Sequence, residues 1–538
     1  MLLTPTDAPA FVNRFTRELP ADKIEENYCR QVQDAAYSRV KPARTSNPVL
    51  LSLNKELACE LGLQPLLEDK AALARLLSGN ALLSGMDPFA MAYGGHQFGH
   101  WAGQLGDGRA INLGEISIAN KKHLTLQLKG AGVTPYSRHA DGRAVLRSSL
   151  REYLCSEAMF HLGVPTTRAL SLVSTGDKVV RDMLYDGNPK AEPGAIVCRV
   201  APSFIRFGNF ELPASRGDKG LLRRLLDFVV VTDREDLAER VRLASSGSSL
   251  TDVYLDWFQQ VCRLTQTMIV NWMRVGFVHG VMNTDNMSVL GLTIDYGPYG
   301  WIDDYNPDWT PNTTDAANRR YRFGNQPAIA RWNLYQLANA IYPVVQDADS
   351  LQSILVKLPS EYDVEFTTMM SQKLGFQHPN NCPQELIEEL KRLLCLQPTD
   401  MTLFFRLLSE FDAVNEQSNV YEVVYEAFYD VSRAQPAIIH AYQSWESHYR
   451  RCLLSDAGSH AQQKRLMHSV NPAYVPRNYL AQQAIDAAEA GDIHVFTKLL
   501  GVLEKPYQQQ SSAEAYAGLK RPDWAVDKAG CSMLSCSS

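Results

Sequence analysis

Hydrophobic and polar residues alternate strictly over residues 124–129, with Leu124, Leu126 and Leu128 on one face of the chain. A period of two is typical of a β-strand with one buried face, so we predict a strand here. Over residues 144–162 the apolar positions instead recur every four residues, which predicts an amphipathic helix that stops at Gly163-Val164-Pro165. The apolar stripe of this helix is Leu146, Leu150, Leu154, Ala158 and Leu162.

Helical periodicity dominates after about residue 215. A long amphipathic segment, 253–275, is followed directly by a compact loop-and-strand region, 279–300. Between Tyr93 and Gly114 the chain is instead glycine-rich, which favours short strands and tight turns. Further helices are predicted over 48–63, 331–341, 384–396, 420–433 and 480–490.

This order of elements predicts an α+β protein with two lobes and a cleft between them. We expect an N-terminal helical extension over residues 1–90 and a strand-rich lobe over 91–215. A helical lobe is expected over 216–503, and a polar, mobile tail over 504–538 that ends in Cys-Ser-Ser.

Composition narrows the class of protein. The 538 residues are 45% hydrophobic and 21% charged, as in globular proteins, and the net charge of −6 provides no basic field for nucleic acid or membrane. The N-terminus lacks a signal-peptide pattern, and Asp7 and Glu18 disfavour a mitochondrial presequence. The ten cysteines form no CxxC and no zinc-type cluster. We therefore expect a cytoplasmic enzyme.

Three pieces of a nucleotide site follow one another in the first half of the chain. Gly106 and Gly108, next to Arg109, lie in a predicted hairpin, where glycine lets the backbone approach phosphate oxygens; the alternative is a simple turn. Lys129 ends the alternating strand on its polar face. Glu152, on the following helix, is expected to orient this lysine onto phosphate, with Glu157 as the competing partner.

The fourth piece gives the strongest signal. Asn286 stands seven residues after His279, and Asp295 opens an Asp-Tyr-Gly turn behind a hydrophobic strand. Kinase-like phosphotransferases place their metal-binding Asn and Asp in this way. Amide and carboxylate oxygens are hard ligands suited to Mg²⁺, so Asn286 and Asp295 are the predicted metal ligands.

One position departs from the kinase pattern. Val281 stands two residues after His279, where a phosphotransferase keeps its base, and valine accepts no proton. Either the site binds nucleotide without catalysis, or a neighbour takes over. Asp285 is the expected substitute as proton acceptor.

These residues resemble the selenoprotein O (YdiU) family of protein adenylyltransferases, which have a pseudokinase fold. The resemblance runs from about Tyr37 to the C-terminus. Among the strings that carry it are Tyr93-Gly94-Gly95-His96-Gln97-Phe98-Gly99, Gln127-Leu128-Lys129-Gly130-Ala131-Gly132, Arg199-Val200-Ala201-Pro202-Ser203 and His279-Gly280-Val281-Met282-Asn283-Thr284-Asp285-Asn286.

The resemblance implies a protein-kinase-like two-lobed fold and transfer of AMP from ATP to Ser, Thr or Tyr hydroxyls of proteins, including the chain itself. It implies Mg²⁺ or Mn²⁺ as the metal and UTP as an alternative nucleotide. Arg199 and Arg206 are then expected to clamp phosphates. The other implied nucleotide contacts are Gly106, Gly108, Arg109, Lys129, Asp141, Gly142 and Asp295.

The resemblance also directs attention to the tail. Cys536 occupies the third-from-last position, where animal members carry selenocysteine, and some bacterial relatives pair it with a cysteine in the loop after the Asp-Tyr-Gly turn. Here Pro311 stands in that loop position. A disulfide between Cys531 and Cys536, both expected to be exposed, is the substitute that we predict; an inert tail thiol is the alternative.

Two other function classes stay open at this point. One is a kinase-like phosphotransferase, and the other is a nucleotide-binding pseudokinase scaffold without catalysis, which Val281 favours.

Overall fold

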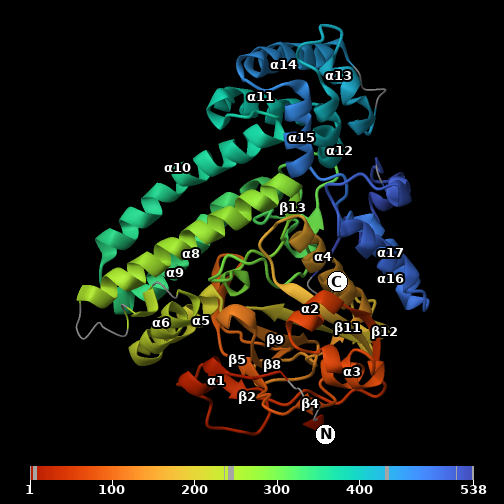
Figure 1. The fold of residues 1–538 in the computed structure, drawn as a ribbon. Coiled ribbons are helices and arrows are strands. Elements are labelled where there is room, and N and C mark those ends of the chain that lie inside the picture. Colours follow the sequence, from red (N-terminus) through yellow and green to blue (C-terminus); the bar gives the residue numbers. More distant parts are fainter. Residues whose placement is uncertain are drawn as a thin grey trace.

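In the computed structural model, the N-terminal part of the chain contains one large antiparallel sheet (Figure 1). The structure describes residues 2–3, 9–234, 237–239, 241, 248–430, 435–516 and 518–535. Across these residues the strand order is β2-β5-β8-β9-β12-β11-β3, and β10 pairs with β12. Its strands are β2 (Tyr37–Arg39), β3 (Val49–Leu53), β5 (Phe89–Met91), β8 (Ala110–Ser117), β9 (His123–Lys129), β10 (Ala144–Val145), β11 (Arg168–Arg181) and β12 (Lys190–Ala201).

Smaller pairings accompany this sheet. They join β1 (Leu2–Leu3) to β4 (Leu82–Leu83), β6 (Gly94–Gln97) to β7 (His100–Gln104), and β13 (Phe277–Val278) to β14 (Gly300–Trp301). The β6–β7 pair is an antiparallel hairpin that stands apart from the main sheet and lies over the 3-10 turn Thr284–Asn286.

The predicted strand and helix that frame the site are confirmed. Strand β9 buries Leu126 and Leu128 on one face against α3 (Lys70–Leu77), and it turns Gln127 and Lys129 to the other face. Helix α4 (Leu146–His161) lays its apolar stripe on β11 and β12. The period-2 and period-4 patterns each place the apolar side chains on one face of the element. Burial of these side chains therefore fixes which face of the strand and of the helix packs against the core.

Helices make up most of the remaining chain, in two packed groups (Figure 1). The group next to the sheet contains α5 (Phe207–Ser215), α6 (Lys219–Asp233), α8 (Ser248–Val275), α9 (Gln326–Val345) and α10 (Ala348–Lys373). The second group contains the far end of α10 with α11 (Gln384–Leu394), α12 (Met401–Leu407), α13 (Val420–Val423), α14 (Pro436–Ser455) and α15 (His460–Val470).

The C-terminal helices return to the sheet. Helices α16 (Asn478–Glu489) and α17 (His494–Leu503) pack on the outer side of α4, as Figure 1 shows. The N-terminal part of the chain contains two short helices, α1 (Arg14–Glu18) and α2 (Lys55–Glu60). Within the ranges that the structure describes, no helix combines the length and apolarity needed to cross a membrane.

Three expectations about elements are wrong. The first ninety residues are not a helical extension, because β2, β3 and β5 join the main sheet and only Lys55–Glu60 of the predicted helix 48–63 is helical. The predicted helix 420–433 ends at Val423 and continues as a 3-10 turn, Tyr425–Ala427; residues 431–434 lie outside the described residues. The glycine-rich segment 105–109 is no hairpin, since it links β7 to β8 and these belong to different sheets.

Candidate active site

A cavity of about 610 Å³ brings together most of the residues singled out from the sequence. Its walls come from the loop before β8, the ends of β9 and β12, the segment 136–143 and the loops on either side of Asp295. The predicted residues that line it are Gly106, Gly108, Arg109, Lys129, Asp141, Gly142, Arg199, Asp285, Asn286 and Asp295. Glu152 and Arg206 lie behind this wall and contact it.

Lys129 lies between two carboxylates. Its Nζ is 2.7 Å from Oε2 of Glu152 and 3.4 Å from Oδ1 of Asp295. Glu157, the competing partner, instead holds Arg168 at 2.8 Å and accepts from Asn54, so it is out of the site. Burial lowers the pKa of Lys129, while Glu152 and Asp295 oppose that effect.

Asp295 is the most heavily paired carboxylate of the cavity. Arg199 Nη1 lies 2.6 Å from its Oδ1, and Arg206 Nη1 lies 2.5 Å from its Oδ2. Burial would raise the pKa of Asp295, but the charges of both arginines and Lys129 hold it well below its usual range. Arg199 and Arg206 thus contact a carboxylate of the chain, whereas the family resemblance implies that they contact phosphates.

Asp285 is a carboxylate of a different kind. Its Oδ2 accepts a hydrogen bond from Gln97 over 3.3 Å, whereas its Oδ1 is buried with no partner among the described residues. Burial raises the pKa of Asp285 to about 7, with Arg206 opposing. The backbone carbonyl of Asp285 accepts a hydrogen bond from Arg206 over 2.9 Å. Arg206 therefore contacts both Asp285, through the backbone, and the carboxylate of Asp295.

Asn286 has an oxygen free for a ligand. Its Nδ2 donates to the carbonyl of Val281 over 2.9 Å, which turns the amide so that Oδ1 keeps no donor among the described residues. Val281 also lines the cavity, and its side chain accepts no proton. His279 is structural: its ring stacks on Trp272, and its Nε2 lies 2.9 Å from the carbonyl oxygen of Ile294.

The glycines of the loop before β8 are required by packing against residue 136. A Cβ at Gly106 would come within 2.3 Å of the Tyr136 ring, and one at Gly108 within 2.9 Å of the Tyr136 carbonyl oxygen. Gly106 also has a φ of 79°, which glycine adopts without strain. The loop is therefore pressed onto Tyr136 in the cavity wall.

Asp141 and Gly142 form the outer rim. Asp141 Oδ1 lies 2.6 Å from Arg181 Nη2, and the carboxylate is 43% exposed on its side chain. A Cβ at Gly142 would come within 2.1 Å of the carbonyl oxygen of Gly132. Both residues thus fix a tight turn at the mouth of the cavity.

The tail differs from the expectation of mobility. Cys531 is 2% exposed, and burial raises its pKa to about 11, so it is not the exposed thiol that we predicted. Leu534 forms backbone hydrogen bonds with Pro311 and Thr313, of 2.9 Å and 2.8 Å. The tail thus packs on the loop that carries Pro311; Cys536 lies outside the described residues, and its pairing stays a prediction.

Sequence reasoning passed over several side chains of this site. Gln127 accepts from Arg199 and lies on the same face of β9 as Lys129, so the period-2 pattern contained that signal. Asp107 is 2% exposed and lies 3.9 Å from Arg206. Gln97 and Tyr93 belong to a motif whose chemistry the sequence alone did not indicate; the Tyr93 hydroxyl accepts from Arg206 over 3.3 Å.

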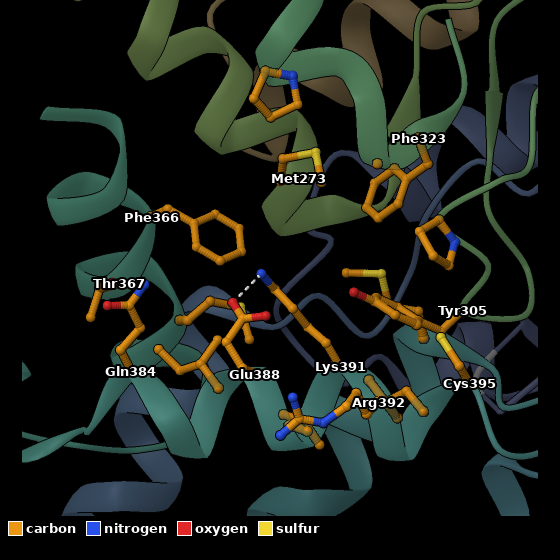
Figure 2. Close-up of a pocket in the computed structure, with 18 of the residues that line it drawn as sticks. Met273, Tyr305, Phe323, Phe366, Thr367, Gln384, Glu388, Lys391, Arg392 and Cys395 are labelled. Atoms are coloured by element: carbon orange, nitrogen blue, oxygen red, sulfur yellow. Dashed lines mark hydrogen bonds and ion pairs between the residues drawn. The ribbon is translucent and has the colours of Figure 1, made fainter. Parts of the chain in front are cut away.

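A second cavity, of about 720 Å³, lies between α10, α11 and the loop that contains Tyr305 (Figure 2). Its lining is mostly aromatic and aliphatic, with Phe366, Met273 and Phe323 facing one another across it. Lys391 enters the cavity but is paired with Glu388 at 2.7 Å. The charged side chains of its lining are Asp363, Glu388, Lys391 and Arg392, and none of the predicted site residues lines it, so the first cavity is the candidate active site.

Known proteins are similar to this chain over most of its length. Residues 23–504 match the family model described as "Protein adenylyltransferase SelO". The chain is 54% identical over 540 residues to a protein from Rhodopirellula baltica named "Protein nucleotidyltransferase YdiU", with 98% of this chain and 99% of that protein covered. Proteins of the same name from an Azoarcus species and from Xanthomonas campestris are each 55% identical, over the same shares of both chains.

Proposed function

The chain belongs to the SelO family of protein adenylyltransferases, so it is a protein nucleotidyltransferase, and we propose that it transfers AMP from ATP to hydroxyl groups of proteins. The observation that carries the proposal is the pair of dissimilar carboxylates in one cavity. Asp295 is neutralised by cations, whereas Asp285 keeps a buried oxygen without a partner.

The proposed nucleotide contacts follow from the charges of the cavity. Lys129, held by Glu152, and Arg109 are two of the cations that line the cavity, and we assign them to phosphate. The glycine loop at Gly106 and Gly108 provides backbone close to the nucleotide. Arg199 and Arg206 support the site through Asp295, and they reach phosphate when the pairing with that carboxylate changes.

The residues present fit a divalent cation. Asn286 has a free amide oxygen and Asp295 a carboxylate in the same cavity, and both are hard oxygen ligands. The described residues hold no group of three or more His, Cys, Asp or Glu side chains suited to a metal, and Mg²⁺ with two protein ligands typically relies on phosphates and water for the rest. Bound there, Mg²⁺ or Mn²⁺ would neutralise phosphate charge.

Asp285 takes the proton in this proposal. An acceptor hydroxyl of Ser, Thr or Tyr attacks the α-phosphate, its proton passes to the free oxygen of Asp285, and pyrophosphate leaves. Gln97 holds the second oxygen of this carboxylate. Val281 provides no alternative base. UTP as donor, self-modification and a cytoplasmic location without nucleic-acid or membrane partners are further parts of the proposal.

We also propose the protein-kinase-like, two-lobed description of the fold. The mixed α/β architecture, the Lys129–Glu152 pair between β9 and α4, and the order of the loop residues support it.

The label that travels on ATP tests the function. The chain is incubated with Mg²⁺ and ATP carrying ³²P at either the α- or the γ-phosphate, and the protein is then examined by mass spectrometry. We expect label from the α position and an AMP adduct. Label from the γ position would indicate a kinase, and binding without label from either would indicate a scaffold. The Asp285→Asn variant serves as the negative control.

A further inference from the structure

Three aromatic rings and one arginine form a continuous cluster beside the proposed base. The His96 ring lies 5.2 Å from that of Trp101 and 5.5 Å from that of Trp332. The guanidinium of Arg320 lies 4.8 Å from the Trp332 ring. We call these four residues the aromatic cluster; Trp101 is 39% exposed, and the other three are partly exposed.

Arg320 forms no ion pair with a carboxylate among the described residues. No carboxylate of the described residues lies within 4.0 Å of its guanidinium, and its Nε is buried without a hydrogen-bond partner. The neighbouring Asp315 directs its two oxygens to the backbone N–H groups of Arg320 and Tyr321. Arg322, two residues further on, is by contrast paired with Asp308 at 3.0 Å.

The β6–β7 hairpin connects this charge to Asp285. A Cβ at Gly95 would lie 2.9 Å from Oδ1 of Asp285, and a Cβ at Gly99 would lie 3.4 Å from the guanidinium carbon of Arg320. Four residues of extended chain span at most about 13 Å. Arg320 and the proposed base therefore lie at two points of one short hairpin, a few residues of peptide length apart.

The hairpin holds this geometry firmly. His96 Nδ1 lies 2.6 Å from Glu211, and the His96 backbone N–H donates to Thr284, the residue before Asp285, over 2.7 Å. Glu211, on α5, also accepts a hydrogen bond from Thr284, so both of its carboxylate oxygens have partners other than Arg320. The guanidinium of Arg320 thus keeps no carboxylate partner within 4.0 Å among the described residues.

We propose that the aromatic cluster binds a segment of the protein substrate that carries an acidic side chain a few residues from the acceptor hydroxyl. Arg320 pairs with that carboxylate, and Trp101 and Trp332 pack against the segment. Tryptophan and arginine are the residues that most often carry binding energy at protein interfaces. The inference rests on the proposed function and specifies the acceptor that the site prefers.

Matched acceptor peptides test it. Each contains one Ser and differs only in Glu, Gln or Lys at the third position on either side, and transfer from α-labelled ATP with Mg²⁺ is measured. For the full chain we expect a kcat/KM for the better Glu peptide about fivefold above that of its Lys counterpart, which corresponds to about 1 kcal/mol. Arg320→Ala should remove this preference, mainly through KM, and Arg320→Glu should reverse it.

Arg322→Ala is the matched control, since Arg322 lies on the same loop and already has a partner. It should keep the preference, and thermal melting checks that every variant is folded. Equal use of all peptides, failure of every peptide while the chain labels itself, or a preference that survives in Arg320→Ala would overturn the inference. Absence of any α-label transfer, including to the chain itself, would instead contradict the proposed function.

Discussion

Gln97 donates a hydrogen bond from its side-chain amide to Oδ2 of Asp285 over 3.3 Å, and the other oxygen of that carboxylate stays without a partner among the described residues. Strand β6, which carries Gln97, packs directly on Asp285 at Gly95. The amide thereby fixes the rotation of the carboxylate and leaves one oxygen for the acceptor proton. Gln97 acts through Asp285 and is a positioning residue for the proposed reaction.

This relationship predicts a non-additive pair of mutations. Gln97→Leu should lower the kcat of AMP transfer about tenfold and change the nucleotide Kd less than about threefold, because it disturbs only the base. Asp285→Asn should lower kcat by about 10² to 10⁴. Since both act on one group, the double variant should be no slower than Asp285→Asn. Transfer kinetics and calorimetric nucleotide binding measure this; losses that simply add would contradict it.

The two glutamates of α4 form a matched pair for a second test. Lys129→Ala should lower transfer by about 10² to 10³, and Glu152→Gln should lower it roughly tenfold or more, because Glu152 holds the lysine at 2.7 Å. Glu157→Gln is the control, since this equally buried carboxylate pairs with Arg168 outside the cavity. Its transfer rate per folded molecule should stay within about twofold of the original. A loss in Glu157→Gln equal to that in Glu152→Gln would show that helix stability, and not lysine orientation, is measured.

Thiol reactivity should follow burial and not position in the tail. Cys29, Cys59 and Cys395 are exposed, whereas Cys531 is buried with its pKa raised to about 11. In the native protein at pH 7.5, iodoacetamide should therefore modify those three cysteines before Cys531, because the thiolate is the reactive form. Peptide mapping over time follows the reaction. Early modification of Cys531, or its recovery in a disulfide with Cys536 without loss of fold, would show that the tail leaves its position.

Asp303 should give the protein a pH-dependent stability. Burial raises its pKa to about 6, against the opposing charges of Arg477 and Arg521. Between about pH 4 and pH 6 the folded state therefore keeps a proton that the unfolded chain has released, so stability from this group is highest below pH 4 and falls as pH rises to 6.

Asp303→Asn removes this contribution while Arg477 keeps Asp400 at 2.7 Å. Relative to the original chain, the variant should gain about 1 to 3 kcal/mol in unfolding free energy from pH 4 to pH 7. Denaturant unfolding at several pH values measures the gain, and Asp308→Asn, an exposed carboxylate of the same loop, is the control. A difference that is constant with pH would contradict the assignment.

The site was predictable where its signal is local. The alternation around Lys129 and the apolar stripe of the helix that carries Glu152 are periodic over a few residues, and both elements form as expected. The spacing of His279, Asn286 and Asp295 lies within one short segment, and the structure brings Asn286 and Asp295 to one cavity. Patterns of this kind depend on neighbours in the chain, which the sequence contains directly.

The sequence alone therefore indicates the strand of Lys129, the helix of Glu152 and the shared segment of Asn286 and Asp295, because side-chain periodicity and motif spacing are local properties. Only the tertiary structure shows which distant residues these side chains contact. Arg199 and Arg206 contact Asp295, which lies 96 and 89 residues later in the chain. Leu534 pairs with the loop that contains Pro311 and Thr313, and Thr313 lies 221 residues earlier in the chain. Such contacts depend on strand pairing and packing between distant segments, whose geometry no local pattern encodes. For the same reason strand β3 escaped prediction, because its partner β11 lies far along the chain, with Leu53 opposite Ser171.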